Sequence, residues 1–381
     1  MSLSYFSPNP HAARALVAIV LVASLAACSS APAKPKPAEL APNAALIGVR
    51  QVWTARVGGV TFPLDVNVNG STVTVASADG TVAALDVRTG RDLWRTTLGT
   101  PIAAGVGSDG KLAAVVTTGN EVVAIEGGRE LWRQKLAAQA YTAPLVAGAR
   151  VFVLAADRSV SAYDGQSGRR LWLQQRPGEP LILHQAGVML AVGDTLVVGL
   201  SGRLVGMNPL NGSVRWEAPI ASPRGTNDIE RLVDLVGPVS RVGDGVCTRA
   251  FQTAVGCVDA ARGTVLWTKP ANGSQGVHGD DRFVFGTESD GKVVAWRRAD
   301  GERAWSTDRL QYRGLTAPLS MGRSVVVGDS TGFVHLLSRE DGSLLNRLST
   351  DGSAVVAAPA LAGNTLVVVT RNGGIYGFQP E

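Results

Sequence analysis

Short runs of β-branched and small apolar residues alternate with tight-turn residues along most of the chain. Thr72–Val75 and Thr81–Ala83 form one such pair, and Asp79-Gly80 between them favours a hairpin of two antiparallel strands. No stretch with the amphipathic period of about 3.6 residues interrupts the pattern, so we expect essentially no helix. The turn signal returns at regular spacing and predicts eight hairpins, with turns at Asp79-Gly80, Gly119-Asn120, Asp157-Arg158, Ser201-Gly202, Gln252, Asp290-Gly291, Thr331-Gly332 and Asn372-Gly373.

A tryptophan recurs in phase with these hairpins, and the phrase Ala-x-Asp-x-x-x-Gly-x-x-x-Trp over residues 84–94 returns in similar form. About four short strands per repeat of about 42 residues is typical of a β-propeller blade, because one sheet buries both faces only when neighbours stack on it. A β-helix would need a much shorter repeat. The sequence therefore predicts an all-β, eight-bladed β-propeller with four-stranded antiparallel blades over residues 46–381. The recurring tryptophans are Trp53, Trp94, Trp132, Trp172, Trp216, Trp267 and Trp305.

The two ends of the repeat region complement each other. The last repeat stops near Phe378 without an outer strand, whereas Val49–Val57, with Trp53, has the pattern of an outer strand without the strands that should precede it. We therefore expect this N-terminal strand to pair in the last blade and close the ring, which removes an exposed sheet edge.

The N-terminal residues have the pattern of a targeting segment. His11 and Arg14 precede an apolar run that ends at Ala27 and is too short for a permanent membrane span, so residues 1–27 are predicted to be a signal peptide. The sequence Leu-Ala-Ala-Cys ending at Cys28 resembles the lipobox of bacterial lipoproteins, in which the cysteine is lipidated; a chance cysteine after an ordinary cleavage site is the alternative. Residues 28–45, rich in Pro and Ala, are predicted to be a tether.

Charge and histidine content narrow the classes of function that the sequence supports. The 36 Lys and Arg against 31 Asp and Glu give a net charge of +5 that is spread along the chain, so we expect no nucleic-acid binding. His184, His278 and His335 stand alone, without metal-ligand spacing. We expect no metal, no cofactor and no catalytic residue.

Cys247 and Cys257 flank the hairpin centred near Gln252, and alignment of the repeats puts them opposite each other on the two middle strands. In an oxidising periplasm this position favours a disulfide, with two buried free thiols as the alternative.

Two segments exceed the repeat length. They lie at residues 176–184 and 222–234, each between the outer strand of one blade and the first strand of the next. Loops that exceed the repeat are common partner-binding sites, although tolerated surface insertions are the simpler alternative.

These features together define a resemblance. The repeat phrase resembles the tryptophan-docking repeats of quinoprotein propellers, and with the lipobox, the tether and the insertion Gly-Thr-Asn-Asp-Ile-Glu-Arg-Leu at residues 225–232 the chain resembles the BamB family, lipoproteins of the β-barrel assembly machinery. In the lipoprotein family, Ser29 and Ser30 after the cysteine imply sorting to the outer membrane. His184 stands where the BamB family usually has Arg, and Val236 where it usually has Asp.

The BamB resemblance implies a non-enzymatic scaffold on the periplasmic face of the outer membrane, lipid-anchored through Cys28. It implies binding to the POTRA region of BamA and assistance to outer-membrane protein insertion, with unfolded outer-membrane proteins as further candidate partners. A membrane-tethered quinone-cofactor dehydrogenase is the competing hypothesis. The partner-binding residues that the resemblance implies are Leu181, Leu183 and His184 in one loop, and Glu230, Arg231, Leu232 and Asp234 in the other.

Overall fold

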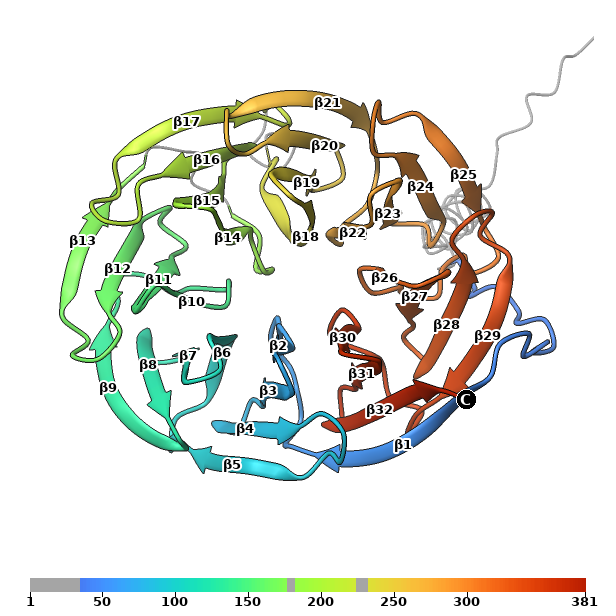
Figure 1. Cartoon of the computed structure of the whole chain (residues 1–381), viewed down its shortest axis with the longest axis horizontal. Helices are drawn as coiled ribbons and strands as arrows, with labels where there is room; N and C mark the ends of the chain where they lie inside the picture. Colours follow the sequence, from blue (N-terminus) through green and yellow to red (C-terminus); the bar gives the residue numbers. More distant parts are fainter. Residues whose placement is uncertain (1–34, 177–181, 224–231) are drawn as a thin grey trace, which may run out of the picture. The chain divides into compact units, whose positions relative to one another are not determined.

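The computed structural model describes residues 35–176, 182–223 and 232–381. Residues 38–381 form one compact unit, a ring of eight four-stranded sheets (Figure 1). The described residues contain no helix, and so none long and apolar enough to cross a membrane. These observations confirm the predicted all-β, eight-bladed propeller.

Each blade is an antiparallel sheet whose strands follow the chain from the ring centre outward, except in the last blade. Blade 1 consists of β2 (Asn67–Asn69), β3 (Thr72–Ala76), β4 (Thr81–Asp86) and β5 (Asp92–Thr97), and blade 2 of β6 (Ile102–Ser108), β7 (Leu112–Thr117), β8 (Glu121–Glu126) and β9 (Arg129–Lys135). Blade 3 consists of β10 (Leu145–Ala147), β11 (Arg150–Leu154), β12 (Val160–Asp164) and β13 (Arg170–Gln174), and blade 4 of β14 (Met189–Val192), β15 (Thr195–Leu200), β16 (Arg203–Met207) and β17 (Val214–Pro219).

The second half of the ring repeats the arrangement. Blade 5 consists of β18 (Leu235–Val242), β19 (Gly245–Ala250), β20 (Ala254–Asp259) and β21 (Thr264–Pro270), and blade 6 of β22 (Val277–Gly279), β23 (Phe283–Thr287), β24 (Val293–Arg297) and β25 (Arg303–Thr307). Blade 7 consists of β26 (Leu319–Met321), β27 (Ser324–Gly328), β28 (Phe333–Ser338) and β29 (Leu344–Ser349), and blade 8 of β30 (Ala360–Ala362), β31 (Thr365–Val369), β32 (Gly374–Pro380) and β1 (Val49–Arg56).

The ring closes as the sequence predicts. Strand β1 pairs antiparallel with β32, with Thr54 opposite Tyr376 and Arg56 opposite Gly374, and the order of the last blade is β1-β32-β31-β30. The N-terminal strand thus completes a blade whose other strands come from the C-terminus (Figure 1). Closure removes the two free edges that an open array of sheets would leave.

The middle strands are apolar on both faces, because each sheet is covered by the neighbouring blade on either side. In β4 every residue but the last is buried, whereas residues of the outer strand β5 are mostly exposed. The continuous runs of Val and Ala therefore form the core, and the alternating outer strands form the rim.

The docking tryptophans join neighbouring blades. Trp53 of blade 8 donates its Nε1–H to the carbonyl of Val87 in blade 1 at 2.7 Å. Trp132 makes the same contact with Gly165 of the next blade at 2.8 Å. Gly90 has φ +68°, and a Cβ there would lie 2.5 Å from the Trp53 ring, so the glycine of the repeat phrase allows both the turn and the indole contact.

Every outer strand also contains a β-bulge, which the repeat pattern did not predict. In β5 the register passes from Leu85–Asp92 to Ala84–Trp94, so Leu93 is the extra residue. A bulge interrupts the hydrogen-bonding edge of the rim strand and disfavours edge-to-edge aggregation. The extra residues are Leu93, Leu131, Leu171, Arg215, Leu266, Ala304, Leu345 and Val52.

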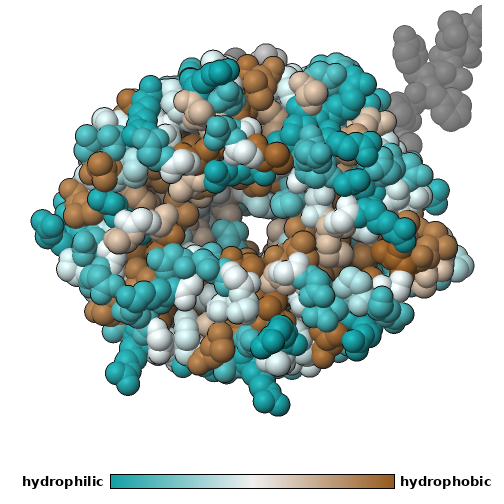
Figure 2. Space-filling view, viewed as in Figure 1, coloured by the Kyte–Doolittle hydropathy of each residue, from teal (hydrophilic) through white to brown (hydrophobic). Residues whose placement is uncertain are grey.

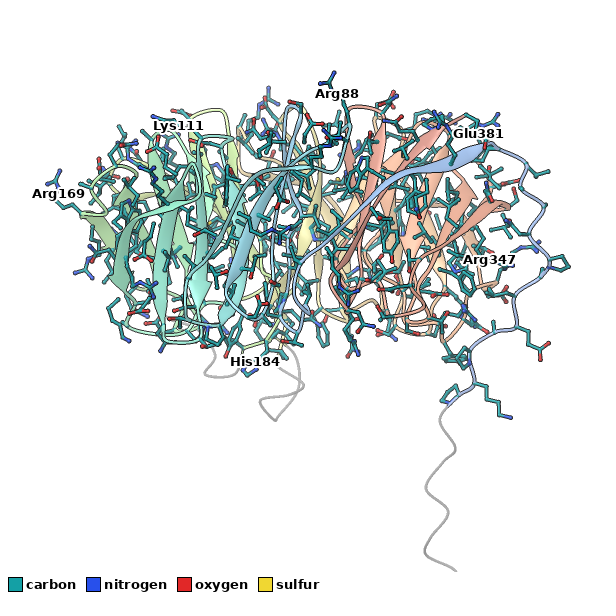
Figure 3. The ribbon with its side chains drawn as sticks, turned by 90° about the horizontal axis from the view of Figure 1, so that it is seen from below. Arg88, Lys111, Arg169, His184, Arg347 and Glu381 are labelled. Atoms are coloured by element: carbon teal, nitrogen blue, oxygen red, sulfur yellow. A yellow bond between two sulfur atoms is a disulfide. The ribbon has the colours of Figure 1, made fainter. Side chains whose placement is uncertain are left out.

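The ring has two different faces. One, which we call the interblade face, carries the loops between blades and the turns between the two middle strands of each blade; the other carries the remaining hairpin turns. Figure 3 shows Arg88, Lys111 and Glu381 on the second face and His184 on the interblade face. In blade 5, Cys247 and Cys257 lie opposite each other on β19 and β20 and form a buried disulfide.

Candidate functional site

The candidate site is the part of the interblade face where the loops before blades 4 and 5 meet. Of the predicted partner-binding residues, Leu183, His184, Leu232 and Asp234 are described. Leu181, Glu230 and Arg231 lie outside the described residues, as does Cys28. The described parts of both loops approach each other, although they are about 50 residues apart in the sequence.

Asp234 holds these loops together. Its carboxylate accepts a hydrogen bond from the backbone N–H of Leu183 at 3.1 Å and pairs with the Arg158 guanidinium at 3.0 Å. The two charged side chains are only 17% and 8% exposed. Arg158 lies in the turn between β11 and β12, so one carboxylate connects segments of blade 3, the blade 3–4 loop and the blade 4–5 loop. Asp234 is thus a structural tie within the site.

Backbone contacts continue this attachment below the surface. The N–H of Gly187 donates to Thr142 Oγ1 at 2.9 Å, and the N–H of Gly237 donates to the carbonyl of Ala186 at 2.9 Å. The described end of the blade 3–4 loop is therefore hydrogen-bonded to the blade 2–3 loop and to β18 of blade 5, which restrains its shape.

The outward surface of the site is aromatic and aliphatic. The exposed His184 ring stacks on Tyr141 with ring centroids 4.4 Å apart and an interplanar angle of 22°. Leu183 is half-buried and lines a pocket together with Tyr141, and Leu232 is half-buried in the other loop. Sequence reasoning did not find Tyr141, although its position in the preceding interblade loop places it on the same face.

The ring centre is the other place where chemistry could occur. The first strands of the blades enclose a cavity of about 560 Å³, visible as the opening in Figure 2. Asp65 and His278 are the titratable groups among the described residues that line it. Water in the cavity reaches the Asp65 side chain, but its enclosure by the ring still raises its pKa to about 6. Burial lowers the pKa of His278, and the positive charge of Arg298 lowers it further.

This lining does not fit a metal-bound quinone. Divalent cations such as Ca²⁺ take about six to eight oxygen ligands, with several from carboxylates. The described lining supplies the single carboxylate of Asp65. Elsewhere, the described residues include no group of three or more His, Cys, Asp or Glu side chains placed to hold a metal ion. The residues present therefore do not support a reaction step through such a cofactor.

Fold and site together define a β-propeller of the tryptophan-docking type in which Asp234 ties the described parts of two interblade loops together. A family model described as "Outer membrane protein assembly factor BamB" matches residues 78–307. A protein of that name from Burkholderia pseudomallei is 40% identical over 96% of this chain and 97% of its own length. Another from Bordetella pertussis is 37% identical over 89% of each chain. The chain belongs to the BamB family.

Solved structures agree on the fold. The crystal structure of BamB from Moraxella catarrhalis superposes with a TM-score of 0.79 at 24% identity, over 87% of this chain and 99% of that one. A quinohemoprotein alcohol dehydrogenase from Pseudomonas putida superposes with a TM-score of 0.69 at 13% identity. That second likeness concerns the propeller architecture alone.

Proposed function

We propose that this chain is a non-enzymatic scaffold lipoprotein of the outer-membrane β-barrel assembly complex. Lipid on Cys28 anchors it at the periplasmic face of the outer membrane. The interblade face of blades 3 to 5 binds the POTRA region of BamA, and the bound propeller assists insertion of outer-membrane proteins. The names of the relatives support a role in outer-membrane protein assembly.

The observation that carries the binding proposal is the tie at Asp234. A loop held by an ion pair and a backbone hydrogen bond loses little conformational entropy when a partner docks on it. The stacked Tyr141 and His184, beside Leu183, supply the apolar and aromatic centre that protein interfaces favour. The tie below and the aromatic surface above give this part of the face the character of a binding site.

The cavity at the ring centre favours the scaffold over the competing dehydrogenase. One carboxylate in an otherwise largely uncharged lining cannot provide the coordination that a cation-bound quinone needs. The dehydrogenase hypothesis retains only the shared architecture, seen at 13% identity.

A pull-down from solubilised outer membranes tests the proposed class. The lipidated chain should retain BamA and the rest of the assembly complex. Cys28→Ala should leave the protein unlipidated and reduce the amount of complex recovered, because the protein is no longer held at the membrane.

Two results would contradict the proposal. Normal fatty-acid incorporation into Cys28→Ala would show that Cys28 is not the anchor. Recovery of no assembly component with the lipidated chain, together with quinone-dependent dehydrogenase activity, would support the competing class.

A further inference from the structure

Residues 38–47, which we call the strap, lie against the outer side of the ring before the chain enters β1. The N–H of Ala38 donates to the carbonyl of Gln311 at 2.9 Å, and the carbonyl of Ala38 accepts a hydrogen bond from Arg313 Nη1 at 3.0 Å. Leu40 packs against the apolar cluster that contains Leu310. The strap is therefore fixed at its start to the loop between blades 6 and 7.

The strap then follows the outer strand of blade 7. Arg347 Nη1 donates to the carbonyl of Ala41 at 3.0 Å, and Asn43 Nδ2 donates to Asn346 Oδ1 at 2.9 Å. Closer to β1, the N–H of Leu46 donates to the carbonyl of Leu345 at 2.7 Å. Contacts are thus distributed along the whole strap.

Blade 7 departs from the repeat where it receives the strap. In the repeat phrase a tryptophan stands four residues after the glycine, but four residues after Gly342 the chain has Asn346. Blade 8 takes its outer strand from the N-terminus, so it has no turn between third and outer strands for an indole to meet. Asn346, 5% exposed, instead donates its Nδ2–H to the carbonyl of Ile47 at 2.7 Å.

Arg313 is held ready for the strap by buried groups. Its Nε–H donates to Asp329 Oδ2 at 2.7 Å and its Nη2 donates to Thr331 Oγ1 at 2.7 Å. His335 Nε2 lies 3.0 Å from the same Asp329 oxygen, and Asp329 and His335 are fully buried. The guanidinium is thereby oriented so that Nη1 meets the carbonyl of Ala38, and loss of the strap would leave the 7%-exposed Arg313 without that acceptor.

We propose that the strap fixes the point at which the membrane tether leaves the ring, at the interblade face between blades 6 and 7. This site is three blades away from the loop that carries Leu183. The effect of the strap on orientation at the membrane depends on the proposed lipid anchor at Cys28. Ten residues, 28–37, would then separate the lipid from the strap, a distance of about 30 Å at about 3.1 Å per residue. The lipid would hold the blade 6–7 rim close to the membrane and the partner loops farther from it.

Amide hydrogen exchange on the lipidated full-length mature chain in detergent tests the strap itself. Leu40→Ser with Asn43→Ala removes one apolar contact and the two hydrogen bonds of the Asn43 side chain, and should speed exchange of the Ala38 and Leu46 amides at least about tenfold. The matched control is Glu39→Ser with Ala44→Ser, at exposed positions of the same segment, and should change exchange less than about twofold. Unprotected amides in the wild type, or equal exchange in all three proteins, would overturn the proposal.

Fluorescence quenching tests the consequence at the membrane. Reporter dyes are placed on Asp308→Cys and on Gln175→Cys, equivalent exposed positions directly after the outer strands of blades 6 and 3. In vesicles containing nitroxide-headgroup lipid, the Asp308 position should be quenched at least about twofold more than the Gln175 position, and Leu40→Ser with Asn43→Ala should bring the ratio close to one.

The outcomes separate the strap from the proposed function. Equal quenching of both reporters in the vesicle-bound wild type would overturn positioning by the strap. Protected strap amides and unequal quenching, in a protein that retains no assembly complex, would support the strap while contradicting the proposed function.

Discussion

Individual carboxylates have different roles in this ring according to what surrounds them. Asp234 is paired with Arg158 and accepts the Leu183 N–H, so it stabilises a loop. Asp329 is fully buried, and burial alone would raise its pKa. Hydrogen bonds, first from His335 and then from Arg313, outweigh this effect and hold the pKa well below the ordinary value. Asp65 faces the central cavity, and enclosure raises its pKa.

The raised pKa of Asp65 gives a pH-dependent prediction. In the folded ring its pKa is about 6, against an ordinary value of 3.8. Ionisation is therefore easier in the unfolded chain, and the folded state becomes relatively less stable as the pH rises from about 4 to about 6. Asp65→Asn should raise the melting temperature modestly at pH about 7.5, because water that reaches the side chain reduces the penalty, and should change it little at pH about 2.5, where the carboxyl is protonated in both states.

Asp281→Asn is the matched control for this measurement, because Asp281 is exposed and does not line the central cavity. Its melting temperature should follow the wild type at both pH values. An Asp65→Asn stabilisation of the same size at both pH values would show that a cause other than ionisation is responsible.

At the residue scale the sequence predicted less than the structure shows. The loops around Leu183 and Asp234 could be found because they exceed the repeat length. The pairing of Asp234 with Arg158 could not, because the two residues are 76 positions apart and only the curvature of the ring brings their segments together. The interblade position of Tyr141 was a usable signal in the repeat pattern that the predicted site did not include.

Strand β1 shows how one element can determine closure of the ring. It contributes Trp53, which is 7% exposed, to the core and pairs along its length with β32. The same segment is the only part of blade 8 that comes from the N-terminus. Its loss would expose the edge of β32 and uncover the face of blade 1 that Trp53 contacts.

Deletion of residues 46–57 should therefore lower the free energy of unfolding by several kcal/mol, since burial of a Trp side chain alone contributes about 2–3 kcal/mol. Urea denaturation followed by tryptophan fluorescence measures the effect. Deletion of residues 29–37 removes chain that precedes the strap and should change the unfolding free energy by less than about 0.5 kcal/mol. Equal unfolding free energies of the two deletion variants would show that pairing of β1 in blade 8 does not stabilise the ring.

Structural elements could be predicted where their sequence pattern repeats along the chain. They could not be predicted where the pattern occurs only once. The hairpins, the tryptophans and the closing strand follow from periodicity and from the incomplete ends. The strap does not, because composition alone predicts an extended segment for residues 38–45 and its contacts use backbone carbonyls, such as that of Ala41. Asn346 in place of a tryptophan was the visible exception in the sequence.

At the scale of the whole molecule, the ring separates its tasks by position. The loops of the candidate site lie over blades 3 to 5, the strap lies on blades 6 and 7, and the opposite face carries the hairpin turns at Arg88 and Lys111 (Figure 3). A rigid propeller keeps these sites at constant separation, which suits a protein that holds other components in place.

The most direct test of the account is the affinity of the purified lipidated chain for the POTRA region of BamA. Leu183→Ala with His184→Ala removes the half-buried leucine and the exposed imidazole at the centre of the site and should weaken binding by about 2 kcal/mol, or roughly thirtyfold, with an unchanged melting temperature. Leu210→Ala with Arg169→Ala changes exposed residues on the opposite face and should bind like the wild type. Wild-type affinity of the Leu183→Ala, His184→Ala protein would contradict the account.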